Sequence, residues 1–284
     1  MNITLPDGSV RELKTGSTGF DLAMDIGPGL AKAAIAVNVN GDQKDLSDPI
    51  NKDSEVSIIT IDSSEGLEIM RHTLTAQVLA RAVKNLYPDT KLAIGPTIAD
   101  GFYYDFEFKK PISPDDLQKI EKEMKKIIDL KSSITKSFHS KKNAINIFKE
   151  NAEPYKESII QESDQADNFQ LYYQDDKKFV DLCRGPHLPS LKHIGSFKLT
   201  KLAGAYWKGD SKNKMLTRIY GTAWKNDKDL NAYLHSIEEA EKRDHRKLGK
   251  EMQLFHFQEE APGMVFWHPN GWTIYRLLQD FIRN

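Results

Sequence analysis

The amino-acid sequence predicts a mixed α+β protein with more than one domain. Its 284 residues correspond to the usual length of two or three domains. Short strand-like runs bounded by Gly, Pro, Asn and Asp are interspersed with segments of helical periodicity, which favours the α+β class. Hydrophobic residues make up 39% of the chain, and no apolar run reaches the roughly 18 residues of a membrane-spanning helix.

Residues 1–61 form the first predicted unit. A strong turn signal, Pro-Asp-Gly-Ser at 6–9, joins its first two strands, and the polar run 62–66 follows the unit as a linker. Two hairpins around a short helix predict a ubiquitin-like roll. The expected order is strand, strand, helix, strand, strand, at residues 3–5, 10–13, 18–26, 33–40 and 55–61.

Residues 62–225 form the second predicted unit, a mixed α+β domain. Apolar residues from Leu67 to Leu86 repeat at helical spacing, so an amphipathic helix is expected over 67–87. Another helix is expected after Ser113, a suitable N-cap followed by proline. The other expected elements are a helix at 141–150 and strands at 91–94, 101–108, 169–173, 178–182, 194–199, 202–207 and 214–222.

Two segments follow the second unit. Residues 226–253 are highly charged with weak apolar content, which indicates one long solvent-bridging linker helix. Residues 254–284 predict short strands at 255–258 and 264–267, then an amphipathic helix from Trp272. A unit of only about 30 residues cannot bury a core, so we interpret it as the start of a third domain and the chain as a fragment.

Cys183 is the only cysteine of the chain and lies in Val-Asp-Leu-Cys-Arg-Gly-Pro-His, residues 180–187. Its thiol is four positions from the imidazole of His187 and two from the acid Asp181. This set indicates chemistry more than packing, although a lone cysteine is most often a small buried hydrophobe. One Cys and one His make half of a structural zinc set, so no metal site is predicted.

Four groups of motifs give the chain a resemblance to a known family. The motifs are Ala-Ile-Gly-Pro-Thr-Ile-Ala-Asp-Gly-Phe-Tyr-Tyr-Asp-Phe (93–106), the Cys183 motif, Ala-Gly-Ala-Tyr-Trp-Lys-Gly-Asp-Ser (203–211) with Arg-Ile-Tyr-Gly-Thr-Ala-Trp (218–224), and Lys-Arg-Asp-His-Arg-Lys-Leu-Gly-Lys (242–250) before Gln-Glu-Glu-Ala-Pro-Gly-Met-Val-Phe-Trp-His (258–268). In this order they resemble the N-terminal part of the bacterial threonyl-tRNA synthetase family over essentially the whole chain.

The resemblance implies a role for each segment. Residues 1–61 resemble the TGS domain, an RNA-associated module, and 62–225 resemble the editing (second additional) domain, which hydrolyses serine mischarged onto threonine's tRNA. Residues 226–253 resemble the linker helix and 254–284 the start of the class II catalytic domain. This portion is therefore expected to bind the acceptor end of tRNA and, at most, to deacylate seryl-tRNA.

The remaining expectations concern partners, cofactors and compartment. By resemblance, the whole enzyme charges tRNA with threonine, and ATP, Mg and Zn are expected in the missing part of the catalytic domain together with the homodimer interface. The formal net charge of −1 does not by itself indicate nucleic acid. Cationic side chains between residues 198 and 218 are the preferred contact with the acceptor arm. A single cysteine and no targeting stretch favour the cytoplasm.

Ester hydrolysis needs an oriented water, a proton acceptor and stabilisation of charge at the carbonyl. By resemblance, Cys183 and His187 match the family's Cys-x-x-x-His element, and Lys156 matches its editing lysine. The candidate catalytic residues are Lys156, Asp181, Cys183, His187 and His72, and the candidate substrate-binding residues are Tyr104, Thr73, Gln77 and Gly95.

The first helix of the second unit departs from the family pattern His-x-x-x-His. This chain has His72 and then Gln77, with one residue inserted between the two positions. Five residues correspond to about 140° around an α-helix, so these side chains are not expected to share a face. Glutamine can position water but cannot act as a base. Two alternatives stay open: a free-standing seryl-tRNA deacylase, and a non-catalytic tRNA-binding module with an inactive editing site.

Overall fold

The computed structural model of the protein describes residues 1–174 and 179–283. The chain divides into two compact units, Met1–Asp227 and Lys228–Asn284. Among the described residues, three sheets belong to the first unit and one two-stranded sheet to the second. Helices accompany these largely antiparallel sheets, so the predicted α+β class is confirmed.

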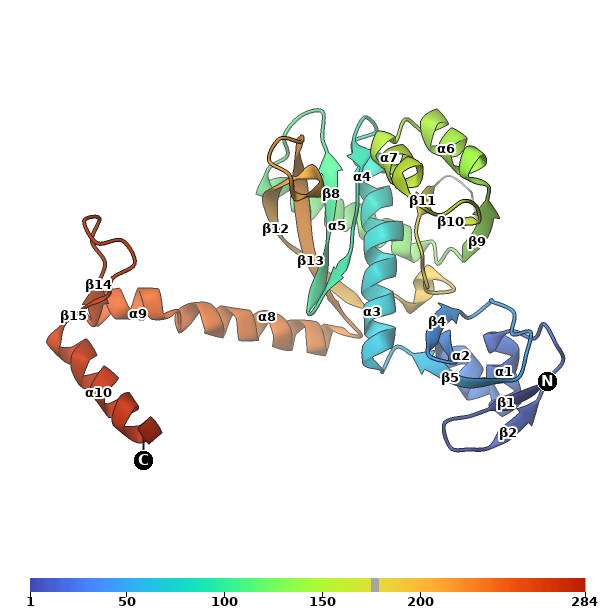
Figure 1. The fold of residues 1–284 in the computed structure, drawn as a ribbon, viewed down its shortest axis with the longest axis horizontal. Helices are drawn as coiled ribbons and strands as arrows, with labels where there is room; N and C mark the ends of the chain where they lie inside the picture. Colours follow the sequence, from blue (N-terminus) through green and yellow to red (C-terminus); the bar gives the residue numbers. More distant parts are fainter. Residues whose placement is uncertain (175–178, 284) are drawn as a thin grey trace. The chain divides into compact units, whose positions relative to one another are not determined.

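The N-terminal domain of the first unit is a five-stranded sheet with two helices (Figure 1). Its elements are β1 (Asn2–Thr4), β2 (Val10–Glu12), α1 (Gly19–Ile26), α2 (Pro28–Ala33), β3 (Ala34–Val39), β4 (Asp42–Asp45) and β5 (Ser54–Thr60). The strand order is β2–β1–β5–β3–β4, with β1 and β5 parallel. Thr18 begins α1 with a capping box, because its hydroxyl accepts the N–H of Asp21. The predicted ubiquitin-like roll is confirmed.

A long helical segment follows, here called the central helix. It consists of α3 (Ser64–Thr73), the π-helical turn η1 (Leu74–Leu79) and α4 (Ala80–Leu86). The expectation of a regular α-helix over 67–87 is therefore wrong in its middle. A π-turn accommodates one extra residue in a helix, and this turn lies where the sequence has its insertion.

The largest sheet of the first unit packs against the central helix. Its strands are β6 (Lys91–Leu92), β7 (Thr97–Ile98), β8 (Gly101–Glu107), β12 (Ser196–Tyr206) and β13 (Met215–Trp224). The two strands expected at 194–199 and 202–207 are one strand, β12, interrupted by a bulge between Leu199 and Lys201. Helix α5 (Pro114–Asp129) begins with the expected Ser113 cap and buries Ile120 and Met124 in the same core.

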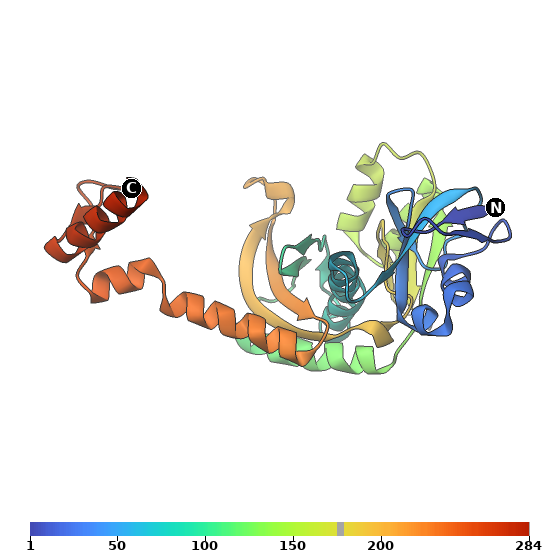
Figure 2. The same cartoon turned by 90° about the horizontal axis from the view of Figure 1, so that it is seen from below.

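A smaller sheet lies on the other side of the central helix, as both views show (Figures 1 and 2). Its strands are β9 (Ile134–His139), β10 (Phe169–Gln174) and β11 (Val180–Leu182), in the order β11–β10–β9. Two helices, α6 (Lys141–Glu150) and α7 (Pro154–Glu162), lie between β9 and β10 in the chain. Strand β9 and helix α7 are not among the elements expected from the sequence, because β9 does not alternate cleanly between apolar and polar residues and α7 is weakly amphipathic. The predicted strand 178–182 starts on a residue outside the described ranges.

The second unit contains α8 (Asp227–Lys242), α9 (His245–Glu251), β14 (Phe255–His256), β15 (Phe266–Trp267) and α10 (Pro269–Arg283). The expectation of a single helix over 226–253 is wrong. The helix ends before Asp244, whose side chain accepts the N–H of Arg246 and so begins a second helix. In the described part of the chain, no helix has both the length and the apolar character that a membrane span requires.

Candidate active site

A cavity of about 430 Å³ lies in the first unit, walled by the central helix, the segment before β8, α7 and the end of β11. Its volume falls within the range of small-molecule sites. Six of the nine candidate residues line this cavity: His72, Gly95, Tyr104, Lys156, Asp181 and Cys183. The other three candidates, Thr73, Gln77 and His187, are not among its lining residues.

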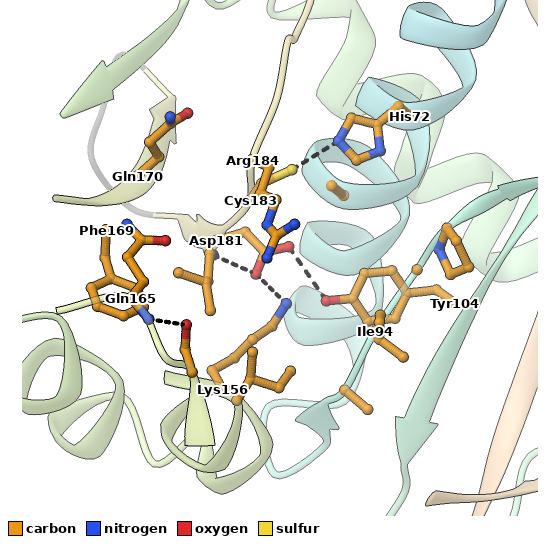
Figure 3. Close-up of a pocket in the computed structure, with 17 residues that line it drawn as sticks. His72, Ile94, Tyr104, Lys156, Gln165, Phe169, Gln170, Asp181, Cys183 and Arg184 are labelled. Carbon is orange, nitrogen blue, oxygen red and sulfur yellow. Dashed lines mark hydrogen bonds and ion pairs between the residues drawn. The ribbon is translucent and has the colours of Figure 1, made fainter. Parts of the chain in front are cut away.

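One wall of the cavity carries a buried ion pair. Lys156 Nζ lies 2.6 Å from Asp181 Oδ1, and the two side chains are 5% and 2% exposed. The N–H of Leu182 donates to the same oxygen, and the hydroxyl of Tyr104 donates to Oδ2 at 3.4 Å (Figure 3). Burial, together with the charge of Asp181, raises the pKa of Tyr104 well above its usual value. Tyr104 therefore stays protonated and acts as a donor.

Another part of the cavity wall carries a thiol and an imidazole. His72 Nε2 lies 2.8 Å from Cys183 Sγ, and the N–H of Gly185 donates to the sulfur at 3.3 Å. The dashed line between His72 and Cys183 in Figure 3 marks the first of these contacts. Burial lowers the pKa of His72, with the charge of Asp181 acting in the opposite direction. His72 therefore favours the neutral form, which can accept a proton.

His187 supports this wall from behind. Its ring stacks on the ring of His72, with centroids 4.6 Å apart and planes 8° from parallel. The hydroxyl of Thr73 donates its one hydrogen to the carbonyl of Ile69, so it must accept from His187 Nδ1 at 3.1 Å. This assignment leaves Nε2 of His187 with a lone pair, and Nε2 has no hydrogen-bond partner among the described residues.

The three side chains form a set of possible metal donors. The ligand atoms of His72, Cys183 and His187 lie within 4.8 Å of one another. Two imidazoles and one thiol are ligands that zinc accepts, with a fourth position left for water or substrate. Only one imidazole, that of His187, is expected beside Cys183 from the sequence, because nothing in the sequence places His72 next to it. That no residue here binds metal stays a prediction.

Gln77 lies away from the cavity. Its side chain is fully buried, and neither its amide nitrogen nor its oxygen has a hydrogen-bond partner in the described part of the chain. Its carbonyl accepts the side-chain amide of Gln174 at 2.6 Å. Ala76, the preceding residue in the π-turn, lines the cavity wall. A role for Gln77 in binding substrate therefore finds no support in the geometry.

Gly95 brings the chain close to the aromatic wall. A Cβ at this position would lie 2.1 Å from a ring carbon of Tyr104 and 2.7 Å from Cγ2 of Thr75. A side chain would therefore displace the ring that donates to Asp181. Glycine is required here by close approach of the backbone.

Sequence reasoning missed several residues that line the cavity. Arg184 is exposed and directly follows Cys183, so the motif itself could have indicated it. Gln165 lies in the loop before β10 and Phe169 begins that strand (Figure 3), where no periodicity or motif identifies them. Phe169, Ile94 and Ile159 add apolar surface to the lining of the cavity.

Most of the cationic residues expected to contact an acceptor arm have acidic partners within the chain. Arg218 forms two hydrogen bonds with Asp105, at 2.7 and 2.8 Å. Lys198 pairs with Glu121 at 3.1 Å. Lys208 and Lys214 also pair with glutamates, Glu162 and Glu107 respectively. The RNA contact at these residues stays a prediction.

Comparison with known proteins gives two family models and a set of close relatives. The model "TGS domain" matches residues 1–60, and "Threonyl and Alanyl tRNA synthetase second additional domain" matches residues 170–220. Threonine–tRNA ligases of Prochlorococcus marinus (strain MIT 9211) and Hahella chejuensis (strain KCTC 2396) are 54% and 55% identical to this chain over 99% of its length.

The chain matches less than half of the length of these relatives. The ligase of Paramagnetospirillum magneticum (strain ATCC 700264 / AMB-1) is also 54% identical over 99% of this chain. In all three cases the chain spans 44% of the relative's own length. The chain therefore corresponds to the N-terminal part of the bacterial threonine–tRNA ligases, with a TGS domain followed by a second additional domain.

Proposed function

We propose that this portion binds the aminoacylated 3′ end of tRNA in the cavity and hydrolyses serine from mischarged tRNA. The observation that supports the proposal is the convergence of two reactive pairs, Lys156–Asp181 and His72–Cys183, on one cavity of about 430 Å³. Such a cavity with convergent ionisable groups is the usual form of a catalytic site.

A threonine-charging enzyme needs a second site for a physical reason. Serine lacks one methyl group of threonine, and the missing methyl changes binding by only about 1–3 kcal/mol in the site that selects threonine. A hydrolytic site too small for the extra methyl completes the discrimination, because it admits the smaller amino acid alone. We therefore propose seryl-tRNA as the substrate and threonyl-tRNA as the ester that the site rejects.

The chemistry assigned to the site is attack of water on the ester carbonyl. The oxygen of water bonds to the carbonyl carbon, and neutral His72 takes the proton that this water loses. The ammonium group of Lys156 stabilises the negative charge that develops on the carbonyl oxygen. The ester C–O bond then breaks, and the ribose oxygen leaves with the proton returned by the imidazole.

Asp181 has two tasks in this proposal. One carboxylate oxygen holds Lys156 at 2.6 Å and accepts the N–H of Leu182 at 2.8 Å. The other oxygen receives only the hydroxyl of Tyr104, at the long distance of 3.4 Å. Oδ2 therefore keeps capacity to accept a hydrogen bond from the α-ammonium group of the amino acid.

For the whole protein we propose the activity of its relatives, the joining of threonine to tRNA. ATP, magnesium and zinc would then be bound by parts of the enzyme that this chain does not contain, and a homodimer in the cytoplasm would be the working form. These proposals rest on the 54–55% identity with threonine–tRNA ligases and on no geometry of this chain.

The test is deacylation of seryl-tRNA by the 284-residue chain. We expect release of serine, little release of threonine from threonyl-tRNA, and no threonine-dependent pyrophosphate exchange. Lys156→Ala should lower kcat roughly 100- to 1,000-fold, as loss of an oxyanion-stabilising group does in other enzymes. If the unaltered chain binds tRNA but releases no serine, the non-catalytic tRNA-binding module replaces this proposal.

A further inference from the structure

A carboxylate of the N-terminal domain bonds to residues that pack behind the candidate active site. Asp45 is the last residue of β4 and is only 6% exposed. Its Oδ1 accepts the backbone N–H of His187 at 2.8 Å, and its Oδ2 accepts the hydroxyl of Tyr172 at 2.8 Å. A residue of the first sheet thus bonds to the last residue of the Cys-x-x-x-His segment and to a tyrosine of β10.

Both partners of Asp45 determine where the His187 ring lies. The ring of Tyr172 meets the His187 ring edge-on, with centroids 4.4 Å apart. A Cβ at Gly185 would lie 2.0 Å from the Tyr172 oxygen, so the turn between Cys183 and His187 runs directly against this phenol. A shift of Tyr172 or of the His187 backbone would therefore move the ring that stacks on His72.

The charge of Asp45 is balanced within the same contact. Lys136 Nζ lies 2.8 Å from Asp45 Oδ2 and 2.6 Å from Asp48 Oδ1, with its side chain 11% exposed. Burial raises the pKa of Tyr172, and the charge of Asp45 raises it further. Tyr172 therefore remains a donor to Asp45, and the contact has one defined pattern of hydrogen bonds.

We propose that Asp45 is a positioning residue through which the N-terminal domain fixes His187 and, by ring stacking, the His72–Cys183 pair. The chain of contacts is Asp45 to His187 and Tyr172, His187 to His72, and His72 to Cys183. The N-terminal domain would then set the rate of the neighbouring domain without touching its substrate. A test of this inference by activity rests on the proposed seryl-tRNA hydrolysis. Tests by alkylation of Cys183 and by the imidazole signals do not.

Asp48 provides a matched control. It pairs with the same Lys136, at 2.6 Å, and belongs to the same domain. Its Oδ2 accepts the backbone N–H of Asp45 at 3.2 Å, but unlike Asp45 it makes no hydrogen bond with Tyr172 or His187 in the described structure. Removal of either carboxylate takes one negative charge away from Lys136. Only removal of Asp45 also takes away the hydrogen bonds to His187 and Tyr172.

The experiment compares Asp45→Ala with Asp48→Ala in the 284-residue chain. Three experiments are done on each variant. They measure kcat and KM for seryl-tRNA deacylation, the rate at which iodoacetamide alkylates Cys183 as a function of pH, and the imidazole ¹H–¹⁵N signals. For Asp45→Ala we expect kcat to fall roughly 10- to 100-fold with little change in KM, because small misplacement of reacting groups has effects of this size. The pH profile of alkylation and the His187 signals should shift too.

Asp48→Ala should stay within about twofold of the unaltered chain in kcat and keep its alkylation profile. Equal changes in both variants would overturn the inference, because loss of charge at Lys136 would then explain them. If the unaltered chain does not hydrolyse seryl-tRNA, the proposed function fails while alkylation and imidazole signals still decide the positioning role. If Asp45→Ala does not fold, Tyr172→Phe replaces it, with a smaller change of the same direction expected and no change as the contradicting result.

Discussion

The two walls of the cavity solve the burial of polar groups in different ways. The Lys156–Asp181 wall holds full opposite charges, 2.6 Å apart, almost without contact with solvent. The other wall holds His72 beside Cys183, and burial lowers the pKa of the imidazole, so the neutral form of His72 is favoured. One wall therefore provides fixed charge and the other a proton acceptor, which are the groups that the proposed ester hydrolysis needs. The walls should therefore respond differently to substitution.

The largest expected effect is on the free energy of unfolding, and it differs between variants that lose one charge of the Lys156–Asp181 pair and variants that lose both. Lys156→Ala leaves the Asp181 carboxylate buried without its partner, so the free energy of unfolding should fall by about 3–5 kcal/mol. The double variant Lys156→Met with Asp181→Leu removes both charges and should recover most of that loss while remaining inactive. Urea denaturation measures the difference. Equal stability of the single and double variants would contradict a buried, mutually dependent pair.

The neutral wall should show the opposite balance between stability and activity. His72→Gln keeps a polar side chain of similar reach but removes the proton acceptor, so deacylation should slow by roughly 100-fold or more. Its free energy of unfolding should change by less than about 1 kcal/mol. Single-turnover deacylation and urea denaturation measure the two quantities. A rate within a few fold of the unaltered chain would exclude His72 as the acceptor.

A third prediction concerns the residue that the π-turn removes from the cavity. Gln77→Met replaces a fully buried amide, which has no hydrogen-bond partner among the described residues, with an apolar side chain of similar size. The free energy of unfolding should rise by about 1–3 kcal/mol, the usual cost of an unsatisfied buried polar group. Seryl-tRNA deacylation should keep its rate. A large fall in deacylation without unfolding would place Gln77 in the site after all.

The smallest expected effect is a dependence of stability on pH. Burial lowers the folded-state pKa of His72 below its ordinary value of 6.5, so below that pH the unfolded chain binds a proton that the folded chain does not. Stability should therefore fall as pH drops from about 6.5 to the lowered folded-state pKa, and His72→Gln should weaken this fall. His193, whose pKa burial also lowers, remains as background in that variant. Chemical denaturation at several pH values tests the sign, and a rise in stability on acidification would contradict it.

Local signals predicted the elements whose own residues define them. The cap at Ser113 and the turn at residues 6–9 were visible because side chains and backbone of neighbouring residues interact. Helix α7, by contrast, carries Lys156 but has weak amphipathicity, so periodicity could not reveal it. The break of the linker helix at Asp244 was also missed, although an N-capping side chain marks it.

In the candidate active site, the sequence identified several residues but not the contacts that they make with one another. The resemblance to the synthetase family identified Lys156, Asp181 and Cys183, and all three line the cavity. The sequence could not show that the His187 ring stacks on the His72 ring, because the two residues are 115 positions apart in the chain. The α-helical count already separates Gln77 from His72, but the motif still made Gln77 a candidate substrate-binding residue; the π-turn between them is visible only in the structure.

Patterning, caps and motifs are properties of nearby residues, so they predict the class of fold, the order of the domains and the chemical groups available. Which of these groups meet depends on tertiary packing. It paired Lys156 with Asp181 and His72 with Cys183, and it brought Asp45 of the N-terminal domain against His187. These contacts join segments distant in sequence, and their geometry is fixed by packing of a shared core that local propensity does not encode.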